Sequence, residues 1–316
     1  MEKLLVGSAR HLEYSKSHSL SYLMLHLPFA CDYNCTQCCN KVQFTHDGPP
    51  LSLVEIKSLI DEAKSLSFSV LVIAGEGEPL LDRNFREIVR IANEKGLMPY
   101  IFTNGRHLNP DMLDFLKHQN ASLVINLNSL KEEAYESLNR RPGSCKEVQK
   151  NIANLRAAFS DTHAELSGYG LRRIAINTVL SKLNKEEIPK IIDFCGDDFV
   201  FVLNTPMIRG NAIGDHNFED VKPRIETIPL GTTSDMKWCA YMRNGISIGS
   251  SGEILACAYA LECSGYLGNV RQGGLKKYMG AANKVVDNFY AAEGHSRCIV
   301  RHQQYPQFIN RLKGKK

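Results

Sequence analysis

The sequence predicts an α/β fold, in which a partial (βα)6 barrel over residues 20–205 is followed by a small α+β domain over residues 206–316. Six short apolar runs alternate with amphipathic helical patterns up to about residue 205, and this alternation is typical of parallel βα units. Beyond that point the alternation stops, and proline, glycine and charged residues become more frequent through residues 206–238. Six units are too few for a closed eight-fold barrel, so we expect the sheet to stay open.

Each expected strand of the barrel is a short run rich in aliphatic and β-branched residues. Residues 1–19 precede the first of them and are interpreted as an N-terminal extension. The six strands are expected over residues 22–27, 69–74, 100–102, 123–127, 174–179 and 199–203.

The helices between these strands are indicated by caps and by apolar residues at helical spacing. Ser52 with Glu55 three residues later is a capping box. Asn109 followed by Pro110 places a cap and then a proline at the first helical position. The remaining helical patterns cover residues 85–92 and 146–158 and begin near Asn184.

The second region contains one clear element, a hairpin. Residues 246–248 and 253–257 flank a turn over Gly249–Gly252, and the second arm ends at Cys257. This region also carries three further cysteines, Cys239, Cys263 and Cys298.

Composition places the chain among ordinary globular proteins. Of the 316 residues, 43% are hydrophobic and 23% charged, and the net charge is only +4. No apolar run is long enough to span a bilayer, and the first residues lack the apolar core of a secretory signal. We therefore expect a cytoplasmic monomer without a membrane or nucleic-acid partner, with its basic C-terminal tail over residues 311–316 as a solvated end.

The ten cysteines indicate metal or redox chemistry, because the cytosol keeps thiols reduced and disfavours disulfides. They divide into an early group within residues 31–39, a late group and two isolated residues. Cys145 and Cys195, the isolated pair, are expected to pack as small apolar side chains.

Three early cysteines, Cys31, Cys35 and Cys38, follow the spacing C-x3-C-x2-C directly after the first strand. Three thiolates on one loop can bind three irons of a 4Fe–4S cluster and leave the fourth iron open. The alternative is a zinc site that takes Cys39 as its fourth ligand. Adjacent cysteines rarely chelate one ion well, so the spacing favours the cluster and leaves Cys39 as a packed neighbour.

On these residues the chain resembles the radical S-adenosylmethionine enzymes, and the resemblance covers most of its length. It implies that the open iron chelates S-adenosylmethionine and that one electron cleaves this cofactor to methionine and a 5′-deoxyadenosyl radical. That radical would remove a hydrogen atom from the substrate. The resemblance also implies a flavodoxin- or ferredoxin-type electron donor.

Further segments match the family in order, each at the end of an expected strand. Gly75-Glu76-Gly77-Glu78-Pro79 resembles the family's glycine-glycine-glutamate-proline segment near the methionine amino group, and its alternative reading is an ordinary strand-to-helix turn. Two positions depart from the family, Glu76 in place of a glycine and Gln37 in place of an aromatic residue. By resemblance the other cofactor-contacting residues are Thr103, Asn104, Asn126, Asn128, Asn177 and either Arg140 or Arg141.

The late cysteines resemble the opening signature of the auxiliary-cluster domains called SPASM and twitch. Twelve residues separate Cys239 from Gly252, and four separate Gly252 from Cys257. With Cys263 and Cys298 the resemblance implies one auxiliary 4Fe–4S cluster, because the further cysteines of a full SPASM domain are missing. A structural zinc on these four thiolates is the alternative.

The expected function is the oxidative or epimerising modification of a ribosomally made peptide, which is the commonest task of relatives with such domains. The alternative is the oxidation of a small alcohol such as an aminocyclitol or sugar. A different class, a non-catalytic iron–sulfur or zinc protein, also fits the cysteines.

Overall fold

The structure is a computed structural model that describes most of the barrel and part of the second region. The described residues are 21–41, 46, 48–160, 172–204, 206–207, 209–218, 245–255, 257, 267–281, 284–285, 287–288 and 291. The expected N-terminal extension over residues 1–19 therefore lies outside them, as do Cys239, Cys263 and Cys298.

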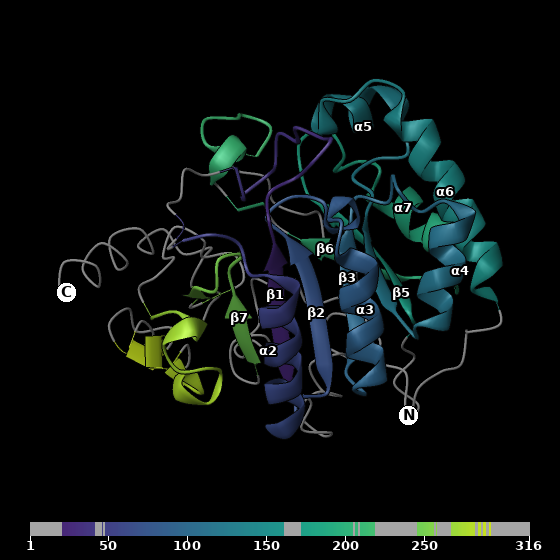
Figure 1. The fold of residues 1–316 in the computed structure, drawn as a ribbon. Helices are drawn as coiled ribbons and strands as arrows, with labels where there is room; N and C mark the ends of the chain where they lie inside the picture. Colours follow the sequence, from purple (N-terminus) through teal and green to yellow (C-terminus); the bar gives the residue numbers. More distant parts are fainter. Residues whose placement is uncertain are drawn as a thin grey trace.

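One eight-stranded sheet organises the molecule, with the strand order β6-β5-β4-β3-β2-β1-β7-β8 (Figure 1). Every pairing in it is parallel except the antiparallel pair of β7 and β8. This confirms the predicted α/β class and the open arrangement of six βα units. The strands are β1 (Tyr22–Leu27), β2 (Val70–Gly75), β3 (Met98–Thr103), β4 (Ser122–Asn126), β5 (Ile174–Val179), β6 (Val200–Asn204), β7 (Gly245–Ile248) and β8 (Ile254–Leu255).

The helices pack along the outer face of the sheet, which Figure 1 shows most clearly for α2 and α3 in front of the first strands. The predicted capping box is present, since the Ser52 side chain accepts from the N–H of Glu55 while the Glu55 side chain accepts from Ser52. Asn109 caps its helix in the same way by accepting from Met112. The helices are α2 (Leu53–Ser65), α3 (Phe85–Glu94), α4 (Pro110–His118), α5 (Glu132–Asn139), α6 (Ser144–Ala158) and α7 (Ile188–Cys195).

Two helices differ from the expectation. Helix α5 was not predicted, because it is short, mostly polar and begins after Lys131 without a side-chain cap. Helix α7 begins at Ile188 instead of near Asn184. The Asn184 side chain bonds the backbone of Ser181 at 2.8 Å and of Asn128 at 2.7 Å, so it closes a turn before the helix begins.

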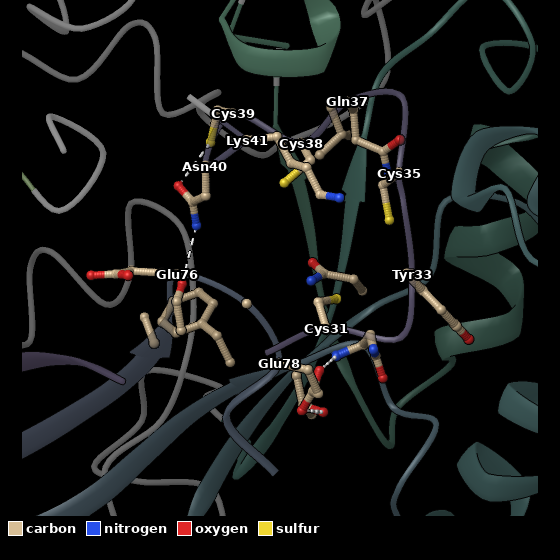
Figure 2. A pocket seen from close by; sticks show the side chains of 18 of the residues that line it. Cys31, Tyr33, Cys35, Gln37, Cys38, Cys39, Asn40, Lys41, Glu76 and Glu78 are labelled. Carbon is tan, nitrogen blue, oxygen red and sulfur yellow. Dashed lines mark hydrogen bonds between the residues drawn. The ribbon is translucent and has the colours of Figure 1, made fainter. Parts of the chain in front are cut away.

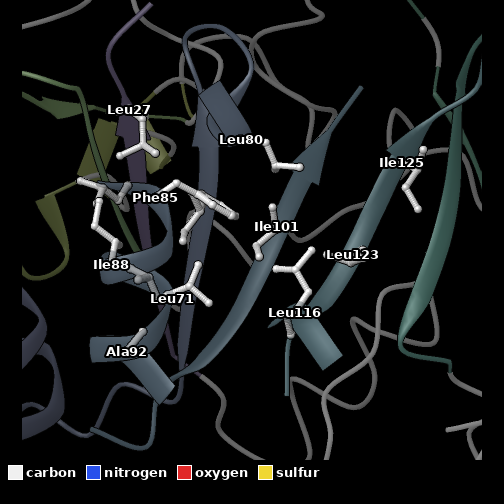
Figure 3. Packing of buried hydrophobic residues seen from close by; sticks show 14 of the residues in the cluster. Leu27, Leu71, Leu80, Phe85, Ile88, Ala92, Ile101, Leu116, Leu123 and Ile125 are labelled. Carbon is white, nitrogen blue, oxygen red and sulfur yellow. The ribbon is translucent and has the colours of Figure 1, made fainter. Parts of the chain in front are cut away.

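The core lies between the sheet and the helices, and strand alternation separates it from the inner face. Leu23, Leu25 and Leu27 of β1 belong to this buried cluster, whereas Met24 and His26 point to the other side of the sheet. Figure 3 shows the cluster continuing along neighbouring strands and helices, for example at Leu71 and Phe85. The inner face is therefore left free for other residues.

The predicted hairpin of the second region is confirmed, and it extends the barrel sheet. Strand β7 pairs in parallel with β1, from Tyr22 opposite Gly245 to Leu25 opposite Ile248. Gly252, in the turn before β8, has a φ of 91°, which only glycine adopts without strain. The second arm is shorter than expected, since β8 ends at Leu255. The boundary between residues 205 and 206 remains a prediction.

Candidate functional site

A pocket of about 230 Å³ opens where the parallel strands reach their carboxyl ends. It brings together most of the site residues that the sequence predicts. Those lining it are Cys31, Cys35, Cys38, Gly75, Gly77, Glu78, Thr103, Asn104, Asn126, Asn128 and Asn177.

The cysteine loop, residues 31–39, follows β1 directly and forms one wall of this pocket. Figure 2 shows the sulfur atoms of Cys31, Cys35 and Cys38 facing a common space. The Cys39 sulfur points away from that space and lies 3.5 Å from the amide oxygen of Asn40. The three thiols of the predicted motif are thus grouped without Cys39.

Backbone contacts from distant parts of the chain hold this loop in place. The N–H groups of Asn34 and Thr36 donate to the carbonyls of Asn139 at 3.2 Å and of Leu138 at 2.8 Å, at the end of α5. On its other side Asn211 donates from its amide nitrogen to the Cys35 carbonyl at 2.8 Å and from its backbone to the Cys38 carbonyl at 3.0 Å. The loop is therefore clamped between α5 and the segment around Asn211.

Asp32, inside the loop, connects it to the end of β3. Its carboxylate accepts from the side chain of Asn104 at 3.2 Å and lies 2.9 Å from Nε2 of His107. Arg106 also donates to it and binds Glu147 at 2.7 Å through its other nitrogen. These partners hold the pKa of Asp32 below its usual value, although its partial burial works in the opposite direction.

The three thiols are protonated at neutral pH in the metal-free chain. Burial raises the pKa of Cys31 to about 11, and it also raises the pKa values of Cys35 and Cys38. Backbone N–H groups oppose this effect, from Tyr33 at Cys31 and from Asn40 at Cys38. Such N–H donors stabilise a thiolate once a metal replaces its proton, so these residues fit an iron–sulfur cluster.

No three His, Cys, Asp or Glu side chains of the described residues lie close enough together to hold a single metal ion. A cubane does not require such a group, because each of its irons takes its own thiolate. Three thiols spread around one space match this requirement. A mononuclear zinc site needs its ligands gathered about one point.

The Gly75–Pro79 segment forms the adjoining wall and touches the start of the cysteine loop. A Cβ on Gly77 would lie 2.3 Å from the Ala30 carbonyl oxygen, and one on Gly75 would lie 2.3 Å from the Gly77 carbonyl oxygen. Neither position has room for a side chain. The N–H of Glu78 donates to the Ala30 carbonyl at 2.6 Å, so the two walls are joined through their backbones.

Glu78 is buried at the base of this wall and is held by three donors. Its carboxylate accepts from the Thr103 hydroxyl at 2.7 Å, the Asn104 N–H at 2.6 Å and the Leu80 N–H at 3.2 Å. Burial outweighs these donors and raises the pKa of Glu78 to about 7. The carboxyl group is therefore fixed in position, and its protonation state changes near neutral pH.

Amide side chains line the opposite wall, formed by β4, β5 and β6. Asn177 donates to the Asn126 side chain at 2.7 Å, and Asn204 donates to Asn177. Asn128 is buried and accepts from the N–H of Val179 at 2.9 Å. The wall thus presents neutral hydrogen-bonding groups whose order is set by their contacts with one another.

Other predicted residues lie elsewhere. Pro79 starts a short 3-10 helix (Pro79–Leu81) and is not among the lining residues, nor are Arg140 and Arg141. Arg140 is exposed at the end of α5, where its φ is 52°. Cys257 is buried two residues beyond β8, while Cys239, Cys263 and Cys298 lie outside the described residues.

The two isolated cysteines are buried, as expected for packed side chains. Cys145 lies in α6 and Cys195 ends α7. Burial raises the pKa of Cys145 to about 11 and that of Cys195 to about 12, so both remain thiols at neutral pH.

Sequence reasoning assigned no role in the site to His26, Tyr33, Asn139 or Asn204, all of which line the pocket. The alternation of β1 places His26 on the inner face beside Met24, a signal that the sequence offered. Burial lowers the pKa of His26 to about 4, so its ring is neutral at pH 7. Asn139 carried no such signal, because its helix was not predicted.

Comparison with known proteins links this arrangement to a family. The model of the Radical SAM superfamily matches residues 27–195. The AdoMet-dependent heme synthase of Methanosarcina barkeri is 28% identical over 168 residues, which are 53% of this chain and 44% of that protein. The GTP 3′,8-cyclase of Marinobacter nauticus is 29% identical over 205 residues, which are 63% of this chain and 57% of that protein. The chain thus spans about half the length of these curated relatives.

Solved structures share the fold at low sequence identity. The structure described as native anSMEcpe with bound AdoMet has a TM-score of 0.58 and 16% identity, with 93% of this chain and 100% of that chain covered. Streptococcus suis SuiB bound to its precursor peptide SuiA has a TM-score of 0.57 and 16% identity, with 80% of this chain and 64% of that chain covered.

Among the described residues, none of the helices combines the length and the hydrophobicity that a membrane span requires.

Proposed function

Because the chain belongs to the Radical SAM superfamily, we propose that it cleaves S-adenosylmethionine reductively and abstracts a hydrogen atom from a substrate. The observation that carries this proposal is the pocket in which three thiols of one loop face the Gly75–Pro79 segment. When bound there, a 4Fe–4S cluster supplies one electron that breaks the C–S bond of S-adenosylmethionine and yields a 5′-deoxyadenosyl radical. A flavodoxin- or ferredoxin-type protein is the proposed source of the electron.

The chain's own residues have separate tasks in this proposal. Cys31, Cys35 and Cys38 hold the cluster by three irons, and the clamped loop keeps them apart. Gly75 and Gly77 allow the backbone to approach the methionine end of the cofactor closely. Glu78, fixed by its three donors, accepts from the cofactor's amino group.

The amide wall contributes the remaining contacts. Asn104 at the end of β3 and the linked pair Asn126 and Asn177 line the pocket, where ribose hydroxyls would find donors and acceptors. Thr103 and Asn128 act through others, since their polar groups already bond Glu78 and the Val179 backbone.

We propose a ribosomally made peptide as the substrate, modified by oxidation or epimerisation. This follows from the resemblance of the late cysteines to SPASM and twitch domains, with Cys239, Cys257, Cys263 and Cys298 as ligands of one auxiliary 4Fe–4S cluster. A small molecule is the second candidate, because the matched curated relatives include a heme synthase and a GTP cyclase. A cytoplasmic location and a monomeric state remain parts of the proposal.

The test is the formation of 5′-deoxyadenosine by the reconstituted, chemically reduced protein. We expect this product and methionine in equal amounts when S-adenosylmethionine is supplied. A protein that carries a reducible cluster but forms neither product would be a non-catalytic iron–sulfur protein. Iron without sulfide, or zinc in place of both, would establish the zinc alternative.

The substrate classes are separated by following the abstracted hydrogen. A candidate peptide or alcohol labelled with deuterium at the reacting carbon should transfer the label to 5′-deoxyadenosine. Transfer from the peptide supports our first candidate, and transfer only from the small molecule supports the second.

A further inference from the structure

Glu76 occupies the position where the resemblance leads us to expect glycine, and its carboxylate is buried against the C-terminal hairpin. The residue is 1% exposed. One carboxylate oxygen accepts from the N–H of Ser250 at 3.2 Å, and the other lies 3.3 Å from Nε2 of His46. Figure 2 shows this carboxylate directed away from the cysteine sulfurs. The extra side chain therefore leaves the backbone of Gly75 and Gly77 free to line the pocket.

The same imidazole reaches a second buried carboxylate. Nδ1 of His46 lies 3.1 Å from Oε1 of Glu253, which is 0% exposed and directly precedes β8. The other oxygen of Glu253 accepts from the N–H of Ser251 at 3.1 Å. His46 thus stands between one carboxylate from the end of β2 and one from the C-terminal hairpin.

The turn that receives Glu76 is itself anchored from outside. Arg271 donates to the Ser251 carbonyl at 2.9 Å and to Glu55 at 2.6 Å. The N–H of Leu51 donates to the Ser250 carbonyl at 2.8 Å. These bonds fix the turn to the start of α2, so Glu76 is tied to a rigid support.

Two buried carboxylates on either side of one imidazole are unfavourable unless their charges are compensated. Burial raises the pKa of Glu76, and the charge of Glu253 adds to this effect, while His46 and Ser250 oppose it. The cost of desolvating buried charges offsets much of their attraction, so such a group adds little net stability. The groups around Glu76 therefore act on the position of the Gly75–Pro79 segment. This position matters for the pocket, because Gly77 and Glu78 contact Ala30, the residue before Cys31.

We propose that Glu76, His46 and Glu253 form a clasp that holds the Gly75–Pro79 segment against the C-terminal hairpin and thereby sets the pocket's affinity for S-adenosylmethionine. Glu76 and Glu253 are positioning residues in this scheme, since the Glu76 carboxylate is directed away from the cysteine sulfurs and Glu253 does not line the pocket. The identity of the ligand rests on the proposed function, whereas the clasp rests on the contacts above.

The test compares Glu76→Gly, which restores the family's residue, with the isosteric variants Glu76→Gln and Glu253→Gln. Glu87→Gln serves as the control, because Glu87 is an exposed carboxylate on α3 that pairs with Arg90. Hydrogen exchange of residues 75–79 and 249–253 is measured on the purified protein without reconstitution. The affinity for S-adenosylmethionine and the rate of 5′-deoxyadenosine formation at saturating cofactor are measured on the reconstituted protein.

We expect Glu76→Gly to speed exchange in both segments and to weaken S-adenosylmethionine binding about tenfold, as for a lost buried hydrogen-bonded group. The rate at saturating cofactor should stay within about twofold, since no group that touches the cofactor is removed. The double variant Glu76→Gln/Glu253→Gln should lose little more affinity than whichever single variant binds S-adenosylmethionine less tightly, because the two carboxylates act as one unit.

Unchanged exchange and unchanged affinity in Glu76→Gly would overturn the clasp, as would equal losses in the Glu87→Gln control. Additive losses in the double variant would show that the two carboxylates act separately, which also contradicts the proposal. If the wild-type protein fails to bind S-adenosylmethionine, the proposed function is wrong, and the exchange measurement still decides whether the clasp exists.

Discussion

The cysteine loop follows β1, and the C-terminal hairpin begins with β7, the strand that pairs with β1, yet the two regions differ in how they bring cysteines together. The loop places three thiols around one space within eight residues, Cys31 to Cys38. The hairpin contributes Cys257 alone among the described residues, and its proposed partners are distributed from residue 239 to residue 298. A local motif is therefore readable from its spacing, whereas a distributed site depends on the whole fold around it.

The difference extends to the contacts that hold each region. The cysteine loop is clamped through its backbone by α5 and Asn211. The hairpin turn also has backbone bonds, from Leu51 to Ser250 and from Val270 to Gly252, and charged side chains hold it in addition. These side chains are Glu76, His46, Glu253 and Arg271. Substitutions should thus separate the two regions.

The largest effect is expected at the early thiols. The variant Cys31→Ala/Cys35→Ala/Cys38→Ala should form no detectable 5′-deoxyadenosine and should keep only the auxiliary iron, about four of about eight atoms per chain. Cys39→Ala is the matched control and should retain activity, because its sulfur faces away from the other three. Loss of product in Cys39→Ala would mean that the grouping of the thiols is different.

The late region is tested by Cys257→Ala. Removing this ligand should lower the iron content to about four atoms per chain while 5′-deoxyadenosine still forms from S-adenosylmethionine alone. Turnover of the true substrate should fall with the auxiliary cluster. An unchanged iron and sulfide content would remove Cys257 from the proposed ligands.

Glu78, in the wall that adjoins the cysteine loop, should make the stability of the metal-free protein depend on pH. Its carboxyl ionises near 4.5 when unfolded and near 7 when folded, so the folded state binds more protons between these values. Its contribution is complete below pH 4.5 and declines by about 3 kcal/mol as the pH rises through 7. Urea unfolding at pH 5 and pH 8 should show a smaller decline in Glu78→Gln, and an equal decline would refute the burial argument.

Asn211 tests the clamp on the cysteine loop. Asn211→Ala removes its amide bond to the Cys35 carbonyl and should lower the free energy of unfolding by about 1 kcal/mol. The cluster should also lose iron faster to a chelator. Asn154→Ala, at a half-buried position of α6, is the control: it should leave iron loss unchanged and should not lower the free energy of unfolding, since alanine favours a helix interior.

The smallest effect is expected at Arg140. It is exposed and does not line the pocket, so Arg140→Ala should change stability by less than about 0.5 kcal/mol and cofactor affinity less than about twofold. A tenfold loss of affinity would support the expectation from sequence, in which Arg140 or Arg141 contacts the cofactor. Calorimetric titration of the reconstituted protein with S-adenosylmethionine measures this affinity.

Much of the barrel was predictable because its strands are short apolar runs and two of its helices begin at recognisable caps. Ser52 with Glu55 and Asn109 with Pro110 are local signals, and both mark helix starts in the structure. Helix α5 was missed because its start lacks such a signal, and the parallel pairing of β7 with β1 was missed because no local pattern encodes a contact more than 200 residues apart.

The site divides in the same way. Strand ends predicted which polar residues meet, from Gly75 to Asn177, since parallel strands end at one edge. The residues that hold the cysteine loop could not be predicted, because Asn139 and Asn211 come from segments that are distant in the sequence. The orientation of the Glu76 side chain could not be predicted either, because it depends on the contacts of its carboxylate with Ser250 and His46.

The clamp on the cysteine loop also has a consequence for biosynthesis. The thiols leave the ribosome early, but Asn211 follows Cys38 by 173 residues, which at 5–20 residues per second is a delay of roughly 9–35 s. During this interval the nascent chain exposes three reactive thiols without the carbonyl contacts that shape them. We therefore expect the loop to reach its clamped form only after the sixth strand has been translated.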